Sequence, residues 1–285
     1  IQQNVDTQEA RRVYDSPSKG VLWGWEVPAY IWTKAIATGT FLMMAVWHFF
    51  NGGLESSSEM AGLITTLVFM GLTGGLLVKD IDRPDRFLYV LLRPQWKSWL
   101  VRGAYIITSF GGFVSLKLLD NYLQLGLDWL WIPGLVFAGL GAVYTAFLFN
   151  QARARDLWQT PIQSAIHMLV HAIMAGSVVM MIIAPESSQW MANILLWGIA
   201  ANVVIMAKEI LLPHDTPDTK KAIHLMTKGY YSKYFWAGIV MGSLIPLVVL
   251  NAFPSMSLIA GSLALVGIYL TEFVRIRVPQ MIPLS

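Results

Sequence analysis

The sequence predicts an all-α, polytopic membrane protein with eight transmembrane helices. Hydrophobic residues make up 55% of the 285 residues, and charged residues make up only 13%. Soluble domains carry about 25% charged residues. The charges lie mainly between apolar runs that are long enough to cross about 30 Å of hydrocarbon as helices. Backbone groups in lipid must be hydrogen-bonded within the chain, so these runs are helices rather than open strands.

The chain divides into three parts. Residues 1–28 form a polar segment that ends in an interfacial stretch rich in tryptophan. Residues 29–150 and residues 151–285 each hold four of the predicted spans. In chain order, the spans are 29–50, 60–78, 98–118, 129–150, 162–184, 189–212, 234–252 and 255–274.

The distribution of basic residues supports these spans and orients them. All but two of the 20 Lys and Arg residues fall on the side of the membrane that holds the N-terminus, here named side A. The exceptions are Lys34, inside the first span, and Lys117, near the opposite side, side B. The positive-inside rule places side A and both termini in the cytoplasm. We therefore expect a multi-pass protein of a bacterial inner membrane.

A repeat relates the two halves of the chain. Lys34–Met44 reads KAIATGTFLMM, and His171–Met181 reads HAIMAGSVVMM. Leu76–Asp80 (LLVKD) resembles Leu211–Asp215 (LLPHD) at nearly the same offset. Both members of each pair run in the same direction, which predicts two four-helix half-bundles related by an axis along the membrane normal. The alternative is chance similarity between apolar helices.

Polar side chains are predicted to converge near side A in the first half. Lys34 lies about 8 Å deep at the helical rise, with Tyr30 one turn earlier on the same face. Asp80 and Asp82, at the end of the second span, are its expected partners, and Tyr144 lies at a similar depth in the fourth span. A quinone carbonyl needs a hydrogen-bond donor, and its reduction consumes two protons. Lys34 and Tyr144 would donate to the quinone, and Asp80 would handle its proton; the alternative for Lys34 is snorkelling to the interface.

The second half carries two intramembrane histidines. His167 and His171 are four residues apart on one helix, so they cannot bracket a haem iron. His48, the remaining intramembrane histidine, lies near side B, and no pair on different helices shares a depth. No haem is therefore expected. The functional interpretation is a proton relay or a second, degenerate site that mirrors Lys34, and the alternative is hydrogen bonding between helices.

Two carboxylates near side A complete the relay candidates. Glu209 and Glu272 are expected to be solvated, or paired with Lys208 and Arg275. No metal site is predicted, and with no cysteine the chain can form no disulfide and bind no cysteine-ligated iron–sulfur cluster. No chain of acidic residues spans the membrane, so the sequence does not support proton pumping.

Three stretches together resemble the NrfD / polysulfide reductase membrane-subunit family. They are Trp23–Gly39 (WGWEVPAYIWTKAIATG), Asp80–Tyr105 (DIDRPDRFLYVLLRPQWKSWLVRGAY), and Tyr144 to Pro161 (YTAFLFNQARARDLWQTP). The resemblance implies a subunit that reacts with menaquinone or ubiquinone and has no redox cofactor of its own. It also implies a docked iron–sulfur subunit of ferredoxin type and a catalytic subunit, often a molybdenum enzyme. No nucleic-acid partner is expected.

The resemblance also implies which residues bind the quinone. Tyr30, Lys34, the region from Asp80 to Arg83, and Tyr144 fall where the family's quinone site lies. The family usually has Gly before the Arg-Pro pair, whereas this chain has Asp82. Arg93 is a further quinone ligand candidate, and docking a partner or lipid headgroups is its alternative role. In many members this side faces the periplasm, and basic loops that dock an acidic partner would reconcile that orientation with the charges found here.

Two other function classes fit the same composition. Parallel repeats around a charged pocket are also found in transporters and ion channels. Such a protein needs its site near the midplane, whereas the predicted polar cluster lies at one edge of the membrane. The second alternative is a purely structural membrane anchor, from which no quinone would co-purify.

Overall fold

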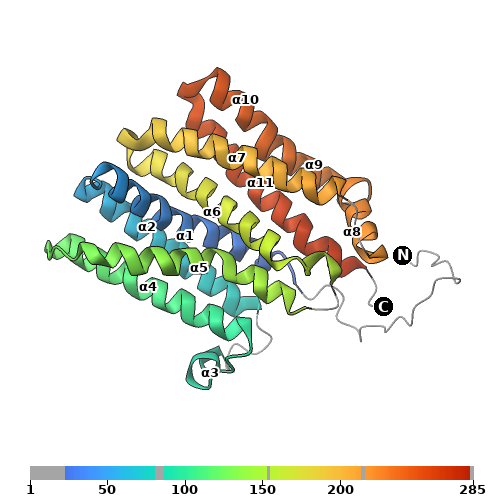
Figure 1. The fold of residues 1–285 in the computed structure, drawn as a ribbon, viewed down its shortest axis with the longest axis horizontal. Coiled ribbons are helices and arrows are strands. Elements are labelled where there is room, and N and C mark those ends of the chain that lie inside the picture. The colour runs from blue at the N-terminus through green and yellow to red at the C-terminus, as the bar shows by residue number, and fades with distance from the viewer. Residues whose placement is uncertain (1–22, 81–86, 153–154, 213–215, 283–285) are drawn as a thin grey trace, which may run out of the picture.

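The computed structural model describes residues 23–80, 87–152, 155–212 and 216–282, and these residues form an elongated bundle of helices (Figure 1). Within them, eight helical segments are long and apolar enough to cross a membrane. The predicted all-α, eight-span fold is confirmed. The spans are α1 (Glu26–Asn51), α2 (Ser56–Asp80), α4 (Trp99–Leu123), α5 (Trp131–Asn150), α6 (Pro161–Ile183), α7 (Ser188–Leu211), α9 with α10 (Ser232–Ile239 and Ile245–Ala252), and α11 (Ser257–Arg277).

Helices α1 and α6 form the centre of the bundle. Helix α1 packs against α2, α5, α6 and α11, and α6 packs against α7, α11, α1 and α5. If α1, α2 and α5 correspond to α6, α7 and α11, these two sets of neighbours are equivalent. The arrangement is thus what the internal repeat leads one to expect, although the boundaries of the two halves stay predictions.

Two glycines let the central helices cross at backbone contact. Gly39 on α1 and Gly176 on α6 are equivalent positions of the repeat. A Cβ atom on Gly39 would overlap the carbonyl oxygen of Ala172, and one on Gly176 would overlap the backbone of Gly39. Only glycine fits at such a crossing, as in other closely packed membrane helices. Because the two helices cross so closely, the polar residues toward the side-A ends of α1 and α6 lie near one another.

The outer helices present apolar side chains outward. On α2, α4 and α7 most of the span is not covered by other helices. Their exposed residues include Val68, Leu116 and Val204. Such an exterior is suited to lipid rather than water.

A π-helix interrupts the seventh span. Val240–Leu244 separates α9 from α10, and Pro246 follows directly. Proline has no backbone N–H to donate to the carbonyl four residues earlier, and π-turns are a common way to absorb such a break. Gly242 packs there against the backbone of Gly267 on α11. The turn also buries Ser243 in the bundle.

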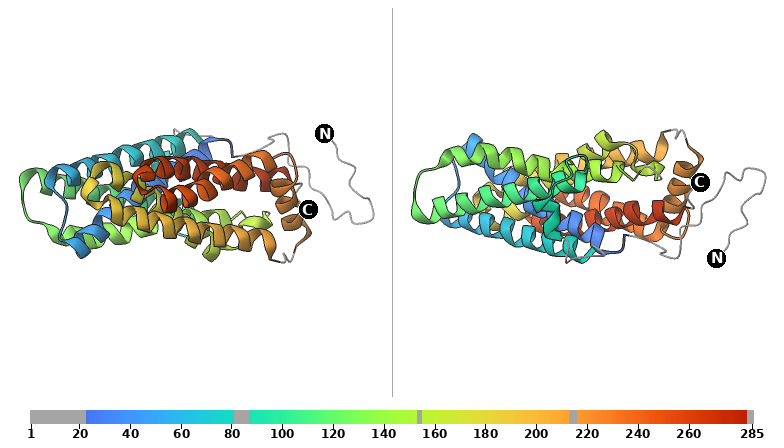
Figure 2. Two further views of the ribbon diagram at one scale, coloured as in Figure 1. Left: turned by 90° about the horizontal axis from the view of Figure 1, so that it is seen from above. Right: turned by 90° about the horizontal axis from the view of Figure 1, so that it is seen from below.

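Side A carries two short helices that hydropathy does not predict. Helix α3 (Phe87–Leu92) precedes α4, and α8 (Pro217–Thr227) runs across the ends of the spans (Figure 2). Thr216 caps α8 by accepting a hydrogen bond from the Thr219 backbone at 3.2 Å. The start and the end of the described chain also meet on this side, where Trp23 N donates to Gln280 Oε1 at 2.8 Å.

Candidate functional site

Lys34 is buried between α1 and α5. Its side chain is 2% exposed, so it does not snorkel to the membrane surface. Its Nζ donates to Thr145 Oγ1 at 2.5 Å and to the Ala142 carbonyl at 3.1 Å. It also lies 4.6 Å from the centre of the Tyr144 ring. The predicted meeting of Lys34 and Tyr144 is therefore present in the structure.

Tyr30 and Asp80 lie on the side-A flank of this site. Tyr30 is 3% exposed, and the charges of Asp80 and Glu272 both act on it. Asp80 is the last residue of α2 and is partly exposed. The carboxylate whose charge acts on Lys34 is Glu272 of α11, not the expected Asp80.

Of the three other predicted quinone ligands, the structure describes only Arg93. Asp82 and Arg83 lie outside the described residues. Arg93 is exposed at side A, between α3 and α4. Its position fits contact with headgroups or a partner protein better than contact with the buried Lys34.

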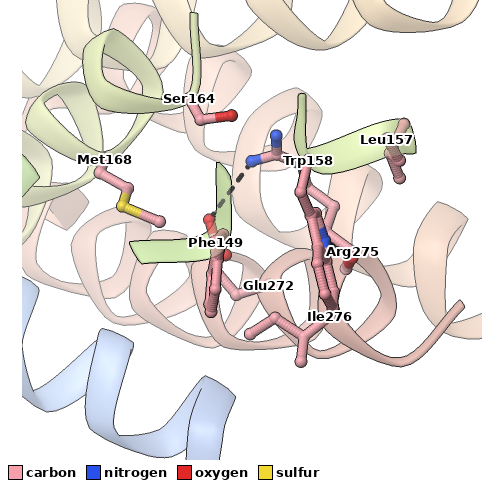
Figure 3. Close-up of a pocket in the computed structure, with 8 residues that line it drawn as sticks. All are labelled: Phe149, Leu157, Trp158, Ser164, Met168, Glu272, Arg275 and Ile276. Carbon is pink, nitrogen blue, oxygen red and sulfur yellow. Dashed lines mark hydrogen bonds and ion pairs between the residues drawn. The ribbon is translucent and has the colours of Figure 1, made fainter. Parts of the chain in front are cut away.

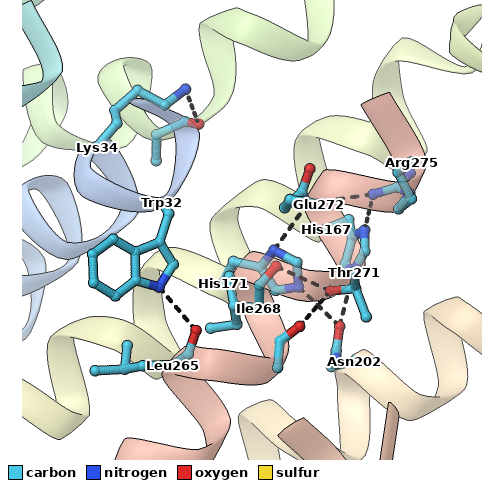
Figure 4. Close-up of polar contacts among 12 residues, drawn as sticks. Trp32, Lys34, His167, His171, Asn202, Leu265, Ile268, Thr271, Glu272 and Arg275 are labelled. Atoms are coloured by element: carbon cyan, nitrogen blue, oxygen red, sulfur yellow. Dashed lines mark hydrogen bonds and ion pairs between the residues drawn. The ribbon is translucent and has the colours of Figure 1, made fainter. Parts of the chain in front are cut away.

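A second polar group fills the space between α6, α7 and α11 (Figure 4). We name it the histidine–arginine cluster; its members are His167, His171, Asn202, Glu209, Glu272 and Arg275. The two imidazole rings lie 4.1 Å apart on one face of α6, as predicted. Both ring Nε2 atoms point to Asn202 Oδ1, at 2.7 Å from His167 and 3.1 Å from His171.

Arg275 is the hub of the cluster. Its guanidinium pairs with Glu209 at 3.1 Å and lies 3.6 Å from Glu272 Oε1. It also contacts His167 Nδ1. From the sequence, Arg275 is expected only as a partner of Glu272. Its position one turn after Glu272, facing the same side of α11, is the signal that could have revealed this role.

Glu209 and Glu272 are both paired, and the pairing expected between Glu272 and Arg275 is present. They are 6% and 1% exposed, so they are buried rather than solvated. Glu209 pairs with Arg275 and not with Lys208, which points outward. Glu272 Oε1 lies 3.1 Å from His171 Nδ1. The two carboxylates therefore belong to the buried cluster.

The repeat relates the cluster to the Lys34 site. Lys34 and His171 are equivalent positions on α1 and α6. Lys34 contacts Thr145 on α5, and His171 contacts Glu272 on α11, the helix that corresponds to α5. In each half, a side-chain nitrogen of the central helix thus contacts a side-chain oxygen of the last helix.

The ligand atoms of His167, His171 and Glu272 lie within 4.8 Å of one another, which is close enough for a metal site. However, the Arg275 guanidinium contacts both His167 and Glu272. It supplies a positive charge where a metal ion would have to sit, and a metal would bind only if Arg275 moved away. The donor set therefore fits the guanidinium better than a metal ion.

A small cavity borders the cluster (Figure 3). Its volume is about 10 Å³, close to the minimum that one water molecule requires. Glu272, Arg275 and Ser164 supply its polar wall. The rest of the wall is apolar and consists of Phe149, Leu157, Trp158, Met168 and Ile276.

Side B holds a separate ionic group around Lys117. This ammonium lies 2.7 Å from Asp120, 3.5 Å from Glu59 and 3.4 Å from Asp128. It explains the one basic residue that the sequence places near side B. The group lies at the opposite end of the bundle from Lys34 and joins α2 to α4.

Comparison with known proteins adds one finding. A family model described as polysulphide reductase, NrfD, matches residues 15–283, nearly the whole chain. The chain matches no curated protein.

Proposed function

Because this chain belongs to the NrfD family, whose members are membrane subunits of respiratory oxidoreductases, we propose that it reacts with quinone in such a complex. It would exchange electrons between the quinone pool, menaquinone or ubiquinone, and a docked iron–sulfur subunit of ferredoxin type. A catalytic subunit, for which a molybdenum enzyme is the first candidate, would then act on the terminal substrate. The chain has no cysteine to hold an iron–sulfur cluster, so it would exchange electrons with a cluster held by the partner.

The observation that carries this proposal is the environment of Lys34. A lysine has three N–H donors, and the contacts with Thr145 and Ala142 account for two of them. The third is free to donate to a quinone carbonyl, and the phenol groups of Tyr144 and Tyr30 lie on the same side of the bundle. A buried ammonium without a carboxylate in contact is costly, and such residues in membranes usually serve a function.

The site is closed in this structure. Lys34, Tyr30 and Tyr144 are each at most 3% exposed. The Tyr144 ring packs against Gly103 of α4, where any Cβ atom would overlap the ring. A quinone headgroup would therefore enter from lipid only with a movement of side chains such as Tyr144.

The histidine–arginine cluster is the proposed source of protons. Quinone reduction needs two protons, and the Lys34 site has no carboxylate in contact with the lysine. We assign the relay to His167, His171, Glu209 and Glu272. The cavity at Glu272 supports this role because it has room for about one water molecule beside the cluster.

We further place the chain in a bacterial inner membrane with both termini in the cytoplasm. The support is the concentration of basic residues at side A. Among the described residues, those that are exposed there include Lys79, Lys97, Lys208, Lys220 and Lys228. Side-A basic residues are also suited to docking an acidic partner.

The first experiment is purification of the native complex in mild detergent, with its subunits identified by mass spectrometry and its quinone extracted and assayed. An iron–sulfur subunit together with bound quinone is the expected result. A lone chain without quinone would overturn the proposal and favour a transporter or a structural anchor.

A further inference from the structure

The protonation of His167 follows from its contact with Arg275. An arginine side chain can only donate hydrogen bonds. Since Arg275 Nη1 contacts His167 Nδ1, this nitrogen must accept. The proton of the neutral ring is then on Nε2, which donates to Asn202 Oδ1 at 2.7 Å.

The orientation of Asn202 follows in turn. Its Oδ1 must face His167, and its Nδ2 donates to Ser243 Oγ at 3.2 Å. The π-helix is what places Ser243 at this point. The same Oδ1 lies 3.1 Å from His171 Nε2, and two acceptors do not face each other at that distance. His171 Nε2 must therefore also carry a proton.

The second ring nitrogen of His171, Nδ1, then determines where a further proton is needed. His171 Nδ1 lies 3.1 Å from Glu272 Oε1, and both side chains are at most 2% exposed. Neither atom has a hydrogen-bond partner among the described residues, because their mutual contact does not have hydrogen-bond geometry. With Nε2 protonated, a neutral His171 would bring an unprotonated ring nitrogen to 3.1 Å from an ionised carboxylate oxygen, and two such atoms repel each other. One additional proton on the pair, as imidazolium with carboxylate or as neutral imidazole with carboxylic acid, removes this repulsion.

We infer that His171 and Glu272 together hold one dissociable proton inside the membrane. The inference deepens the proposed function by naming the proton-holding pair beside Lys34, and it rests on that function only for the use of the proton. The cavity next to Glu272 has room for about one water molecule beside the pair. The electrons of quinone reduction play no part in this acid–base step.

The surrounding charges couple this proton to Lys34. The charged or titratable groups that face the pair are Lys34 and Tyr30 from α1, His167 from α6, Glu209 from α7, and Arg275 from α11. Arg275 and Glu209 compensate each other. With Glu272 ionised and Lys34 charged, the group is neutral, and the additional proton makes it positive. Uncompensated buried charge is costly, so a proton on the pair and a proton on Lys34 oppose each other.

The test is spectroscopic and uses the full chain reconstituted in lipid, without quinone. Nitrogen NMR of the five ¹⁵N-labelled histidines reports the protons on each ring, with the His171→Asn variant to assign the signals. Infrared difference spectra over a pH range report carboxylic acid groups. We expect either a doubly protonated His171 or a neutral His171 with a protonated Glu272. His167 should stay neutral with its proton on Nε2.

Variants distinguish the infrared signal of the His171–Glu272 pair from the signals of other carboxyl groups. Glu272→Gln should remove one titrating group from the infrared spectra, whereas Glu59→Gln, at the Lys117 group of side B, should leave that signal unchanged. Lys34→Met should shift the pH at which the pair titrates. A neutral His171 beside an ionised Glu272 at all pH values would overturn the inference. Because no quinone is present, that result would leave the proposed quinone reaction to its own test.

Discussion

At the scale of single residues, Lys34 is a buried ammonium group held by two neutral oxygens. Hydrogen bonds from a charged donor are about twice as strong as neutral ones, so this group can polarise a quinone carbonyl. We expect Lys34→Ala to abolish quinone-linked turnover of the complex. Turnover with an artificial dye, which accepts electrons before the quinone site, should be retained.

A matched control is available at the membrane surface. Lys79 pairs with Glu26 at 3.3 Å, and its side chain is 56% exposed. Lys79→Ala should therefore keep quinone-linked turnover. Full quinone turnover in the Lys34→Ala complex would exclude Lys34 from the reaction.

The ion pairs of Arg275 lead to a prediction about stability. Its removal would leave Glu209 and Glu272 buried without their cation. Breaking a buried ion pair by deleting one partner costs about 3–5 kcal/mol. We expect Arg275→Leu to lower the thermal unfolding midpoint of the detergent-solubilised chain clearly. Arg102→Leu changes an exposed arginine on α4 and should lower it far less; equal midpoints for the two variants would count against the hub role of Arg275.

Contacts between individual residues could be predicted from the sequence only in the first half of the chain. Lys34 and Tyr144 have similar depths on neighbouring spans, and they do meet. His171 and Glu272 belong to helices whose adjacency the sequence does not reveal, and Glu272 was expected nearer to solvent. Depth counted along one helix also ignores the reach of long side chains, so the ionic network around Arg275 could not be predicted beyond the Glu272–Arg275 pair.

At the scale of elements, the crossing of α1 and α6 depends on Gly39. A methyl group there would overlap the Ala172 carbonyl oxygen, and backbone cannot move aside as a flexible side chain can. Overpacking costs about 1–3 kcal/mol. We expect Gly39→Ala to lower the thermal midpoint and to reduce assembly of the chain with its partners.

Gly112 on α4 provides the comparison for this variant. A Cβ atom at Gly112 meets nothing within 4 Å. Alanine is favoured over glycine in a helix by about 1 kcal/mol, so Gly112→Ala should be neutral or stabilising. If Gly39→Ala behaved in the same way, the close crossing of the two halves would be wrong.

Hydropathy predicts the elements of the bundle unevenly. Each long apolar run became a span, because the requirement for internal hydrogen bonds leaves little choice of structure. Helices α3 and α8 are short and lie at the surface, so they leave no comparable signal. The π-helix depends on Pro246 and on the packing of Gly242 against Gly267, which involves a helix that is distant in sequence.

At the scale of the whole molecule, the predicted repeat gives the two halves of the chain one arrangement but different chemistry. The equivalent positions of Lys34 and His171 lie on the two central helices, which meet at Gly39 and Gly176. The first half retains a lysine with a free donor, while in the second half Asn202 and Arg275 hold the two histidine rings in place. Symmetry therefore places a candidate proton-holding group next to a candidate quinone site without a chain of carboxylates across the membrane.

The orientation of the molecule decides where its partners dock, and the absence of cysteine makes it measurable. Single cysteines introduced into this cysteine-free chain can be labelled with a maleimide that does not cross membranes. Lys220 on α8 is exposed at side A, and Glu55 is exposed before α2 at side B. In intact spheroplasts we expect labelling of Glu55→Cys but not of Lys220→Cys, because the basic side should face the cytoplasm. Permeabilised cells should label both variants. Labelling of Lys220→Cys alone in intact spheroplasts would place side A, the Lys34 site and the docked subunits outside the cytoplasm, and the basic residues would then serve an acidic partner rather than topology.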